Sequence, residues 1–562
     1  MKRILVYILL IFTLNGVLAQ NVEQVIKAKP VKISGGLNAS STFFTSNSST
    51  NQRDPFIWIL NGNMNLNFYG VVNAPFSFMI SKENKTFNQP SYKQFGISPK
   101  YKDLTVHMGY RTMNFSQYTM SGVMFLGGGV EYTPKDKPFA IKGFYGRFAQ
   151  AVQYQTIASY DPNAVILQPA FERWGYGSMV TVGKKGQFVD FIFFKSIDDK
   201  NSINVPDSVD NLKPTENFVL GINTRNKITK NLNFKLEFAL SALSTDIRQP
   251  EIEQETYSYS NNLGFLFSPR TSSQFNKVFN TSLNYKLKFA NVGLSYKRID
   301  PEYQSMGTSF INNDVEEITV NLGTSFYKNK MSFSGNFGTQ KNNLDKSQFT
   351  TNKRFITSAN LTYLATQKLN FVATISNFNT NSTPTQVYLV DSIKYSQATS
   401  NFGVTTNYNF GDTALSQGVS LMTSYQIGNT LNKSGTAVTD ISNTFLNINL
   451  MYRLGFIPQK ISVYASINYS SFVSEGMITN SVGPTIGATK QLMDDKLKVG
   501  LNTTYLNTSG SSKSSLINIR AYGNYSINKH HSCKIGVSVL NKNSNNVGIT
   551  QFQGNVAYAY IL

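Results

Sequence analysis

Residues Ile461 to Tyr469, with the sequence ISVYASINY, place an apolar side chain at every odd-numbered position. Successive side chains of a β-strand point to opposite faces, so this period of two predicts a strand with one apolar face and one wet face. The same alternation recurs at residues 234–241, 446–453 and 517–522. The chain is therefore predicted to consist largely of amphipathic β-strands.

Two architectures are open to such strands. The apolar face meets a second sheet in a soluble sandwich, and it meets lipid in an outer-membrane barrel. Many of the alternating runs reach about nine to thirteen residues, whereas strands of soluble proteins are usually about 5–6 residues long and a tilted strand needs about 9–11 to cross a bilayer. Strand length therefore favours the barrel.

The connections between these predicted strands are alternately short and long. Short turns rich in Gly, Asn, Lys and Asp lie near residues 183–186, 230–231, 328–330, 367–368, 458–460, 494–496 and 529–531. Longer polar stretches lie between them, at residues 198–216, 246–274, 301–313, 341–352, 379–395, 428–441 and 541–550. Short periplasmic turns and longer extracellular loops are typical of outer-membrane barrels.

From about residue 229 onward the short turns recur about every 35–46 residues, and two long strands per period indicate a hairpin repeat rather than a propeller blade.

After the first nineteen residues no apolar run is long enough for a transmembrane helix, and Cys533 is the only cysteine, so a disulfide framework is excluded. We predict an all-β fold: a single large transmembrane antiparallel β-barrel of about 26 strands (about 22–28), over residues 33–562.

The first nineteen residues have the pattern of a signal peptide. Lys2 and Arg3 precede an apolar stretch of about eleven residues, and Val17-Leu18-Ala19 predicts cleavage after Ala19. Residues 20–32 are then a short periplasmic segment before a first strand near Ile33. We therefore expect no N-terminal plug domain, and hence no TonB-dependent transporter.

The last twelve residues, QFQGNVAYAYIL, place Phe552, Val556, Tyr558 and Tyr560 on one face. This stretch resembles the C-terminal signal by which bacterial outer-membrane barrels are recognised for insertion. That signal usually closes on an aromatic residue, and Leu562 departs from it.

A second resemblance covers about the first quarter of the chain. It rests on residues 96–101 (GISPKY), 107–111 (HMGYR), 114–116, 118–119, 122, 127–131 (GGGVE) and 145–148 (YGRF). This string resembles uncharacterised outer-membrane β-barrel proteins of the Bacteroidota, a porin-like family. The resemblance implies a fold and a location, and it brings no activity, substrate or catalytic residue. The crowded glycines allow close approach of a ligand, plug or partner, but bulges and bends in a large sheet are the favoured interpretation.

The sequence contains little catalytic chemistry. Its three histidines are His107, in a predicted strand, and His530-His531, in a predicted turn. A hydrolase would need a Ser or Asp beside His107, and a polar side chain facing the lumen is the favoured interpretation. The histidine pair lacks nearby metal ligands, and no phosphate-binding loop or CxxC motif occurs. We predict no enzyme, no catalytic or metal-binding residue and no cofactor.

The net charge of the chain is more informative about function than its catalytic residue types. The chain carries a net charge of +21, and removing Lys2 and Arg3 leaves +19. Basic residues are costly on a lipid-facing wall, so they should lie in the lumen, turns or loops, where a positive lumen would attract anions. The alternative is that lysines flank the turns and meet anionic headgroups. Nucleic acid is not an expected partner of an exported chain. The candidate lumen or rim charges are Arg111, Arg147, Arg453 and Arg520.

A barrel of this size would be about 50 Å across and would leak if it were empty. We expect loops folded inward, chiefly 198–216 and 246–274, or a separate plug protein. The leading hypothesis is a porin-like conduit with a basic, loop-constricted lumen and an anionic substrate. The alternative is a non-conducting scaffold that holds, or helps display or export, a cell-surface partner protein.

Overall fold

The computed structural model describes residues 29–48, 54–81, 93–154, 168–184, 186–206, 209, 211–255, 261, 264–385, 393–434, 437–544 and 547–562. The predicted signal peptide lies outside these residues. The strands are β1 (Val31–Ser46), β2 (Phe56–Phe68), β3 (Val72–Ser81), β4 (Lys93–Ile97), β5 (Lys100–Tyr101), β6 (Leu104–Thr112), β7 (Met120–Ser121), β8 (Met124–Tyr132), β9 (Phe139–Ala149), β10 (Glu172–Lys184), β11 (Gln187–Asp199), β12 (Glu216–Lys227), β13 (Leu232–Ser244), β14 (Ser273–Lys286), β15 (Ala290–Ile299), β16 (Gly307–Thr308), β17 (Val315–Phe326), β18 (Met331–Lys341), β19 (Thr350–Leu364), β20 (Leu369–Pro384), β21 (Ile393–Gly411), β22 (Leu415–Ser434), β23 (Ala437–Phe456), β24 (Ile461–Ser474), β25 (Met477–Leu492), β26 (Leu497–Gly510), β27 (Ser514–Ser526), β28 (His531–Ser544) and β29 (Val547–Ile561).

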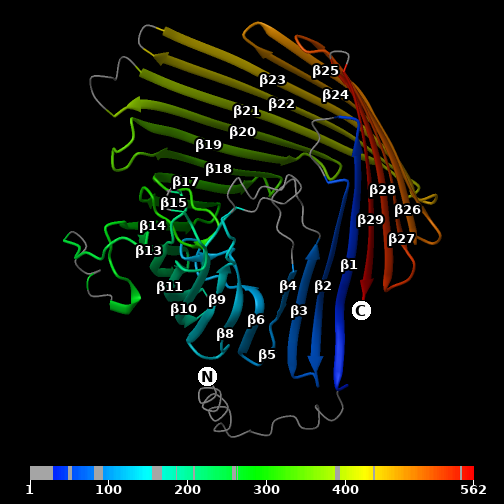
Figure 1. Cartoon of the computed structure of the whole chain (residues 1–562). Helices are drawn as coiled ribbons and strands as arrows, with labels where there is room; N and C mark the ends of the chain where they lie inside the picture. Colours follow the sequence, from blue (N-terminus) through cyan, green and yellow to red (C-terminus); the bar gives the residue numbers. More distant parts are fainter. Residues whose placement is uncertain are drawn as a thin grey trace.

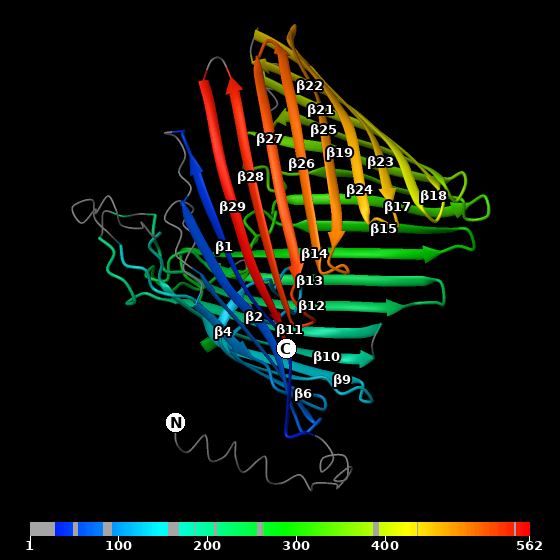
Figure 2. The same cartoon turned by 90° about the vertical axis from the view of Figure 1, so that its right-hand side faces the viewer.

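One sheet closes on itself. Each of its strands pairs antiparallel with its neighbours, and β29 returns to β1, where Tyr560 lies opposite Leu37 (Figures 1 and 2). The sheet contains 27 strands, but β4 and β5 share one position between β3 and β6. Pro99, which has no N–H to donate to the sheet, lies in the break between them. The barrel therefore has 26 strand positions, and the predicted fold class is confirmed.

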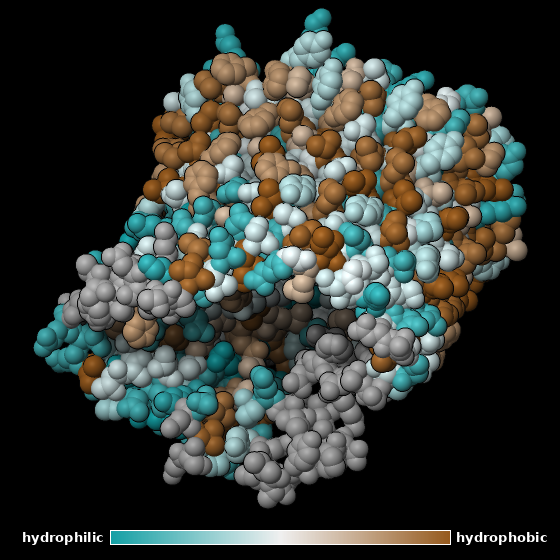
Figure 3. Space-filling model, turned by 90° about the horizontal axis from the view of Figure 1, so that it is seen from above, coloured by the Kyte–Doolittle hydropathy of each residue, from teal (hydrophilic) through white to brown (hydrophobic). Residues whose placement is uncertain are grey.

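The outside of the barrel is apolar. Residues paired across neighbouring strands lie on the same face of the sheet, and one outward row joins Leu283, Leu294, Val320 and Phe337. In Figure 3, apolar side chains crowd the wall of the barrel. Only helices and closed barrels satisfy their backbone hydrogen bonds in lipid, and closed antiparallel barrels with an apolar exterior are outer-membrane proteins. The chain is an outer-membrane β-barrel. A soluble sandwich would need two stacked sheets, and it is excluded because the strands of this chain form one closed sheet.

The predicted strand at residues 461–469 is part of β24, and its odd-numbered residues face outward with Ile486 and Val482 of β25. The structure also contains tight turns whose residues have positive φ, such as Tyr327, Lys328 and Asn329 between β17 and β18. These short turns lie at the end of the barrel where β29 meets the start of β1, which we take as the periplasmic end. In the part of the chain that is described, no helix has the length and apolar character needed to cross a membrane.

The strands differ greatly in length. β6 and β8 have 9 residues, whereas β22 and β23 have 20. The outward apolar residues of β23 run from Phe456 to Leu446, and Thr444, Ser442 and Asp440 continue the same face. Because about 9–11 residues suffice to cross the bilayer, the outer parts of β20–β23 extend beyond the lipid. This long wall is prominent in Figure 2.

Candidate functional site

Two loops that are far apart in sequence meet inside the barrel. They are residues 113–123, between β6 and β8, and residues 300–314, between β15 and β17; together we call them the plug. β7 of the first loop pairs in parallel with β16 of the second. The Tyr303 hydroxyl donates a hydrogen bond of 2.8 Å to the carbonyl of Tyr118, and the Ser305 hydroxyl donates one of 2.6 Å to the carbonyl of Thr119. The two loops therefore fold as one unit.

The plug packs on the inner wall of β8–β17. Its apolar residues, Met113, Phe115, Tyr118, Met120, Tyr303 and Met306, form a buried cluster with Phe125, Phe144, Met179, Ile192, Phe194, Val219, Ala239, Val278, Ile299 and Val315 of the wall. The opposite face of the same strands is the lipid-facing one, because Phe191 and Leu220 there are 52% and 41% exposed. Burial of each large apolar side chain stabilises the docked plug by about 1.5–3 kcal/mol.

Polar anchors fix the position of the plug. Asn217, which is fully buried on β12, accepts a hydrogen bond of 3.0 Å from the backbone N–H of Met306. The Asn217 amide also donates to the hydroxyl of Ser241, and that hydroxyl donates to the carbonyl of Gln304 at 2.6 Å. Hydrogen bonds to buried backbone groups depend on geometry, so these contacts select one docked arrangement.

Two glycines let the plug approach the wall closely. A Cβ atom at Gly221 would lie 2.7 Å from Cγ2 of Thr119, and one at Gly177 would lie 3.2 Å from the ring of Phe115. Both distances are shorter than ordinary van der Waals contact. At Gly221 the nearest group is the plug, whereas at Gly177 and Gly127 it is a backbone carbonyl of a neighbouring strand and at Gly146 it is the ring of Phe125.

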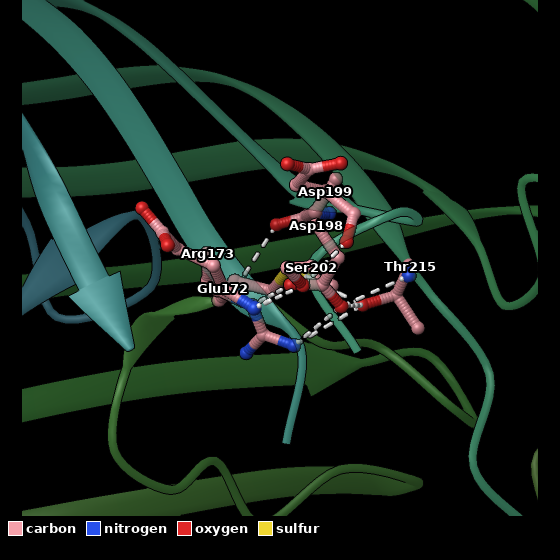
Figure 4. Close-up of polar contacts among 8 residues, drawn as sticks. Glu172, Arg173, Asp198, Asp199, Ser202 and Thr215 are labelled. Atoms are coloured by element: carbon pink, nitrogen blue, oxygen red, sulfur yellow. Dashed lines mark hydrogen bonds and ion pairs between the residues drawn. The ribbon is translucent and has the colours of Figure 1, made fainter. Parts of the chain in front are cut away.

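The plug is also tied to the loop that follows β11 (Figure 4). Arg173 and Asp198 form a bidentate ion pair on the inner face, with distances of 2.7 and 3.0 Å. Asp198 accepts further hydrogen bonds from the backbone N–H and the hydroxyl of Thr215, and that hydroxyl lies 3.8 Å from the sulfur of Met306. The described residues of the 198–216 loop therefore brace the rim beside the plug.

The expectation that the 246–274 loop fills the lumen is wrong. Phe267, in the described part of this loop, is buried against Phe218 and Ala242, with Phe193 and Phe275 beside them. These four wall residues are on the outward face, opposite the plug, because their pairing across neighbouring strands places them on the same face of the sheet as the lipid-facing residues. The described part of the loop around Phe267 turns outward because the outer ends of β11–β14 present an apolar surface on this side as well.

The two plug tyrosines are held in their neutral form. Burial, with a smaller contribution from Glu237, raises the pKa of Tyr118 to about 12, and burial also raises the pKa of Tyr303. A phenol whose pKa is raised keeps its proton up to higher pH, so the Tyr303 hydrogen bond persists as pH rises. We expect plug docking to be unchanged between about pH 6 and pH 9, which conductance recorded across that range would check.

The four predicted lumen or rim charges do not all face inward. Arg111 lies on the inward face of β6 and donates to the hydroxyl of Ser77 at 2.6 Å and to the carbonyl of Pro75 at 3.1 Å. Arg453 and Arg520 are exposed on inward positions of β23 and β27. Arg147 pairs with Trp174 on the outward face, near the outer end of β9. A role of any of them in solute passage stays a prediction.

The lumen has two unlike halves. Strands β18–β29 carry inward-facing basic residues, namely Arg354, Arg453, Lys498, Arg520, Lys534 and Lys542. Within the described ranges of these strands the one carboxylate is Asp440, which faces outward opposite Leu431. The inward carboxylates, including Asp190, Glu237 and Glu317, lie on the half that carries the plug, where Lys142, Lys235 and Lys297 also face inward and two of them form ion pairs with Glu131 and Glu317. The loop at residues 300–314 adds three carboxylates and no Lys or Arg.

A cleft of about 570 Å³ lies along β15–β20, and its lining includes the apolar residues Val292, Leu322 and Ile375. Its lining includes Asn321, Asn336, Ser358, Asn360 and Ser376, all on inward positions of β17–β20.

A hydrolase would need a Ser or Asp side chain beside His107, and the structure places a serine there. The hydroxyl of Ser98 lies 2.9 Å from Nδ1 of His107, and Oε1 of Glu131 lies 3.4 Å from Nε2. Glu131 also pairs with Lys142 at 3.5 Å. Ser98 is only 7% exposed, so its hydroxyl lacks the access that an acyl substrate needs. The geometry supports a polar network inside the wall.

This interpretation predicts that a fluorophosphonate probe will not label Ser98, since a buried hydroxyl cannot reach the phosphorus. The measurement is in-gel labelling of the folded barrel in detergent, with Ser98→Ala as the matched background. Labelling of the natural protein that disappears in Ser98→Ala would make Ser98 a nucleophile and contradict the prediction.

The other two histidines lie at a periplasmic turn. Nδ1 of His530 lies 2.7 Å from the carbonyl of Ile561, and Nδ1 of His531 contacts the hydroxyl of Tyr558. Both therefore hold the turn before β28 against the last strand. Among the described residues no group of three or more His, Cys, Asp or Glu side chains could hold a metal ion.

Comparison with known proteins gives structural likeness only. No protein-family model matches the chain, and no curated protein matches it in sequence. Among solved structures, the P pilus usher PapC translocation pore is 12% identical, with 94% of this chain and 99% of that chain covered and a TM-score of 0.31. Pseudomonas aeruginosa OccK5 is 11% identical over 94% of this chain and 98% of that chain, with a TM-score of 0.27. The FrpB iron transporter from Neisseria meningitidis is 10% identical over 95% and 83%, with a TM-score of 0.32. These values are too low to carry an argument about function.

Proposed function

We propose that the protein is a porin-like conduit for small, hydrated anions, narrowed by its own plug. The observation that carries the proposal is the asymmetry of the lumen. The buried cluster that holds the plug draws its wall residues from β8–β17, and the inward faces of β18–β29 remain polar and largely accessible. A path along this free wall would be narrower than the barrel but still filled with water.

The charge pattern supports the preference for anions. A solute on this path passes six basic side chains and no described inward carboxylate on the free wall, whereas the plug half opposite carries both carboxylates and basic side chains. Walls of one charge sign raise the local concentration of the opposite ion. An anion would therefore be drawn toward β18–β29.

The alternative, a scaffold for a surface partner, has one observation in its favour. The outer parts of β20–β23 form an extension rich in Ser, Thr and Asn, at residues 377–384, 395–400, 428–433 and 438–444. Such a wall offers hydrogen-bonding groups to a protein outside the cell. A sealed scaffold, however, would not need a polar and basic free wall.

Single-channel recording in planar bilayers separates the two functions. We expect stable conductance steps and, across a potassium chloride gradient, a reversal potential that indicates a higher permeability for chloride than for potassium. Equal permeabilities would contradict the anion preference, and a barrel that inserts without any conductance would favour the scaffold. The proposals of export by cleavage after Ala19 and of membership of a Bacteroidota family rest on the sequence patterns alone.

A further inference from the structure

A row of charged side chains crosses the outward face of the barrel next to its apolar band. Arg298 of β15 pairs with Glu316 of β17, Glu316 with Lys341 of β18, and Lys341 with Lys353 of β19. Each lies near the outer end of its strand. The neighbouring row toward the periplasm contains Tyr296, Ile318, Thr339 and Phe355. Charged and apolar side chains therefore share one lipid-facing surface.

Between these rows lies a cleft of about 370 Å³. It is lined by residues of both rows on β17–β19, chiefly Glu316, Ile318, Lys341, Lys353 and Phe355, and also by Gln340 and Arg354. Ile318 and Phe355 are 48% and 50% exposed at its apolar end. The cleft thus presents two ammonium groups and the Glu316 carboxylate at one end and two apolar side chains at the other.

The charges in the row are incompletely balanced. Glu316 contacts Lys341 and lies 4.0 Å from Arg298, and it accepts a hydrogen bond of 2.8 Å from the hydroxyl of Tyr296. Arg298 also lies 3.4 Å from Asp300. Lys353 has no ion-pair partner among the described residues. Like charges directly opposite each other on neighbouring strands are destabilising, so Lys341 and Lys353 favour an anion between them.

We propose that this cleft binds a phosphorylated lipid of the outer leaflet. The phosphate would lie between the ammonium groups of Lys341 and Lys353, and an acyl chain would lie along Ile318 and Phe355. The outward direction of these side chains and their place beside the apolar band fit a lipid headgroup better than a solute of the lumen. The inference rests on the membrane-spanning fold and holds whether or not the barrel conducts.

The test is native mass spectrometry of the purified barrel in detergent, titrated with dioleoyl phosphatidic acid. We expect a bound lipid on the natural protein, and binding at least about tenfold weaker for the double variant Lys341→Gln/Lys353→Gln, which loses two charge-assisted hydrogen bonds. The matched control is Lys490→Gln, which removes an outward-facing lysine at the periplasmic end of β25 and should leave binding unchanged. Each variant is first checked for the β-sheet circular dichroism of the natural barrel.

Two competitors show whether the bound phosphate belongs to a lipid or is free, and whether the acyl chains alone can bind. Dioleoylglycerol, which has the same acyl chains without phosphate, should not displace the lipid, and millimolar inorganic phosphate should displace it poorly. Equal binding to the natural protein and the double variant would overturn the proposal, as would displacement by dioleoylglycerol. Displacement by inorganic phosphate at the same concentration as the lipid would show a free-phosphate site and overturn the lipid assignment.

Discussion

Replacing Tyr303 with alanine should enlarge the conducting path through the barrel. Tyr303 is 1% exposed at the centre of the plug, and its hydroxyl joins the two loops. Removal of a buried aromatic side chain costs about 3–5 kcal/mol. That loss removes part of the apolar burial that docks the plug, together with the hydrogen bond between its two loops, so the plug should undock more often. We expect a higher mean single-channel conductance with marked opening and closing noise.

The matched control is Tyr303→Phe, which keeps the ring and loses only the hydrogen bond, worth about 0.5–1.5 kcal/mol. Its conductance should stay close to that of the natural protein. Undocking is measured separately by maleimide labelling of Met120→Cys in a Cys533→Ser background, because Met120 of the plug is fully buried against the wall. If Met120→Cys becomes accessible in Tyr303→Ala while conductance stays unchanged, the plug does not limit the path.

Reversing the charge of the free wall should reverse ion selectivity. The triple variant Arg453→Glu/Lys498→Glu/Arg520→Glu changes three inward basic side chains on β23, β26 and β27 into carboxylates. No inward carboxylate is described on β18–β29, so the wall itself should change sign between its periplasmic end and its middle. We expect the ratio of chloride to potassium permeability to fall from above one to below one, measured as a change in sign of the reversal potential.

The matched control for this variant is Lys433→Glu, which makes the same change on the outward face of β22, beyond the apolar band. It should leave selectivity unchanged. A triple variant that inserts and conducts with unaltered selectivity would show that ions do not pass along the free wall. Raising the salt concentration should weaken the effect of the triple variant, because exposed charges are screened within about 10 Å at 0.1 M salt.

Much of the fold could be predicted because its pattern is local. The alternation at residues 461–469 is visible from neighbouring residues alone. It correctly indicates which residues of β24 face lipid. The same pattern fails over β11, where Ile192, Phe193 and Phe194 follow one another. Consecutive apolar residues in a barrel strand indicate that both faces are covered, and this was the available sign that the inner wall of β11 lies under a plug.

The candidate site was harder to predict. Arg147 lies where Gly146 and Phe148 flank it, so no alternation indicates its direction, and it faces outward. Which loop enters the lumen depends on which face of the neighbouring wall is apolar. The loop at residues 246–274 packs on an apolar surface outside the barrel, and the loop at residues 300–314 packs on one inside it. Ser98 lies beside His107 only because the break at Pro99 places β4 and β5 along β6.

The sequence alone determined that this protein is a large antiparallel barrel with a lipid-facing exterior, because strand periodicity, strand length and turn spacing are properties of neighbouring residues. Only the tertiary structure decided what the barrel contains. The hydrogen bond between Tyr303 and Tyr118 joins residues 185 positions apart. Such contacts depend on closure of the whole sheet, which brings β6–β8 and β15–β17 to the same side of one lumen, and no local pattern encodes that meeting.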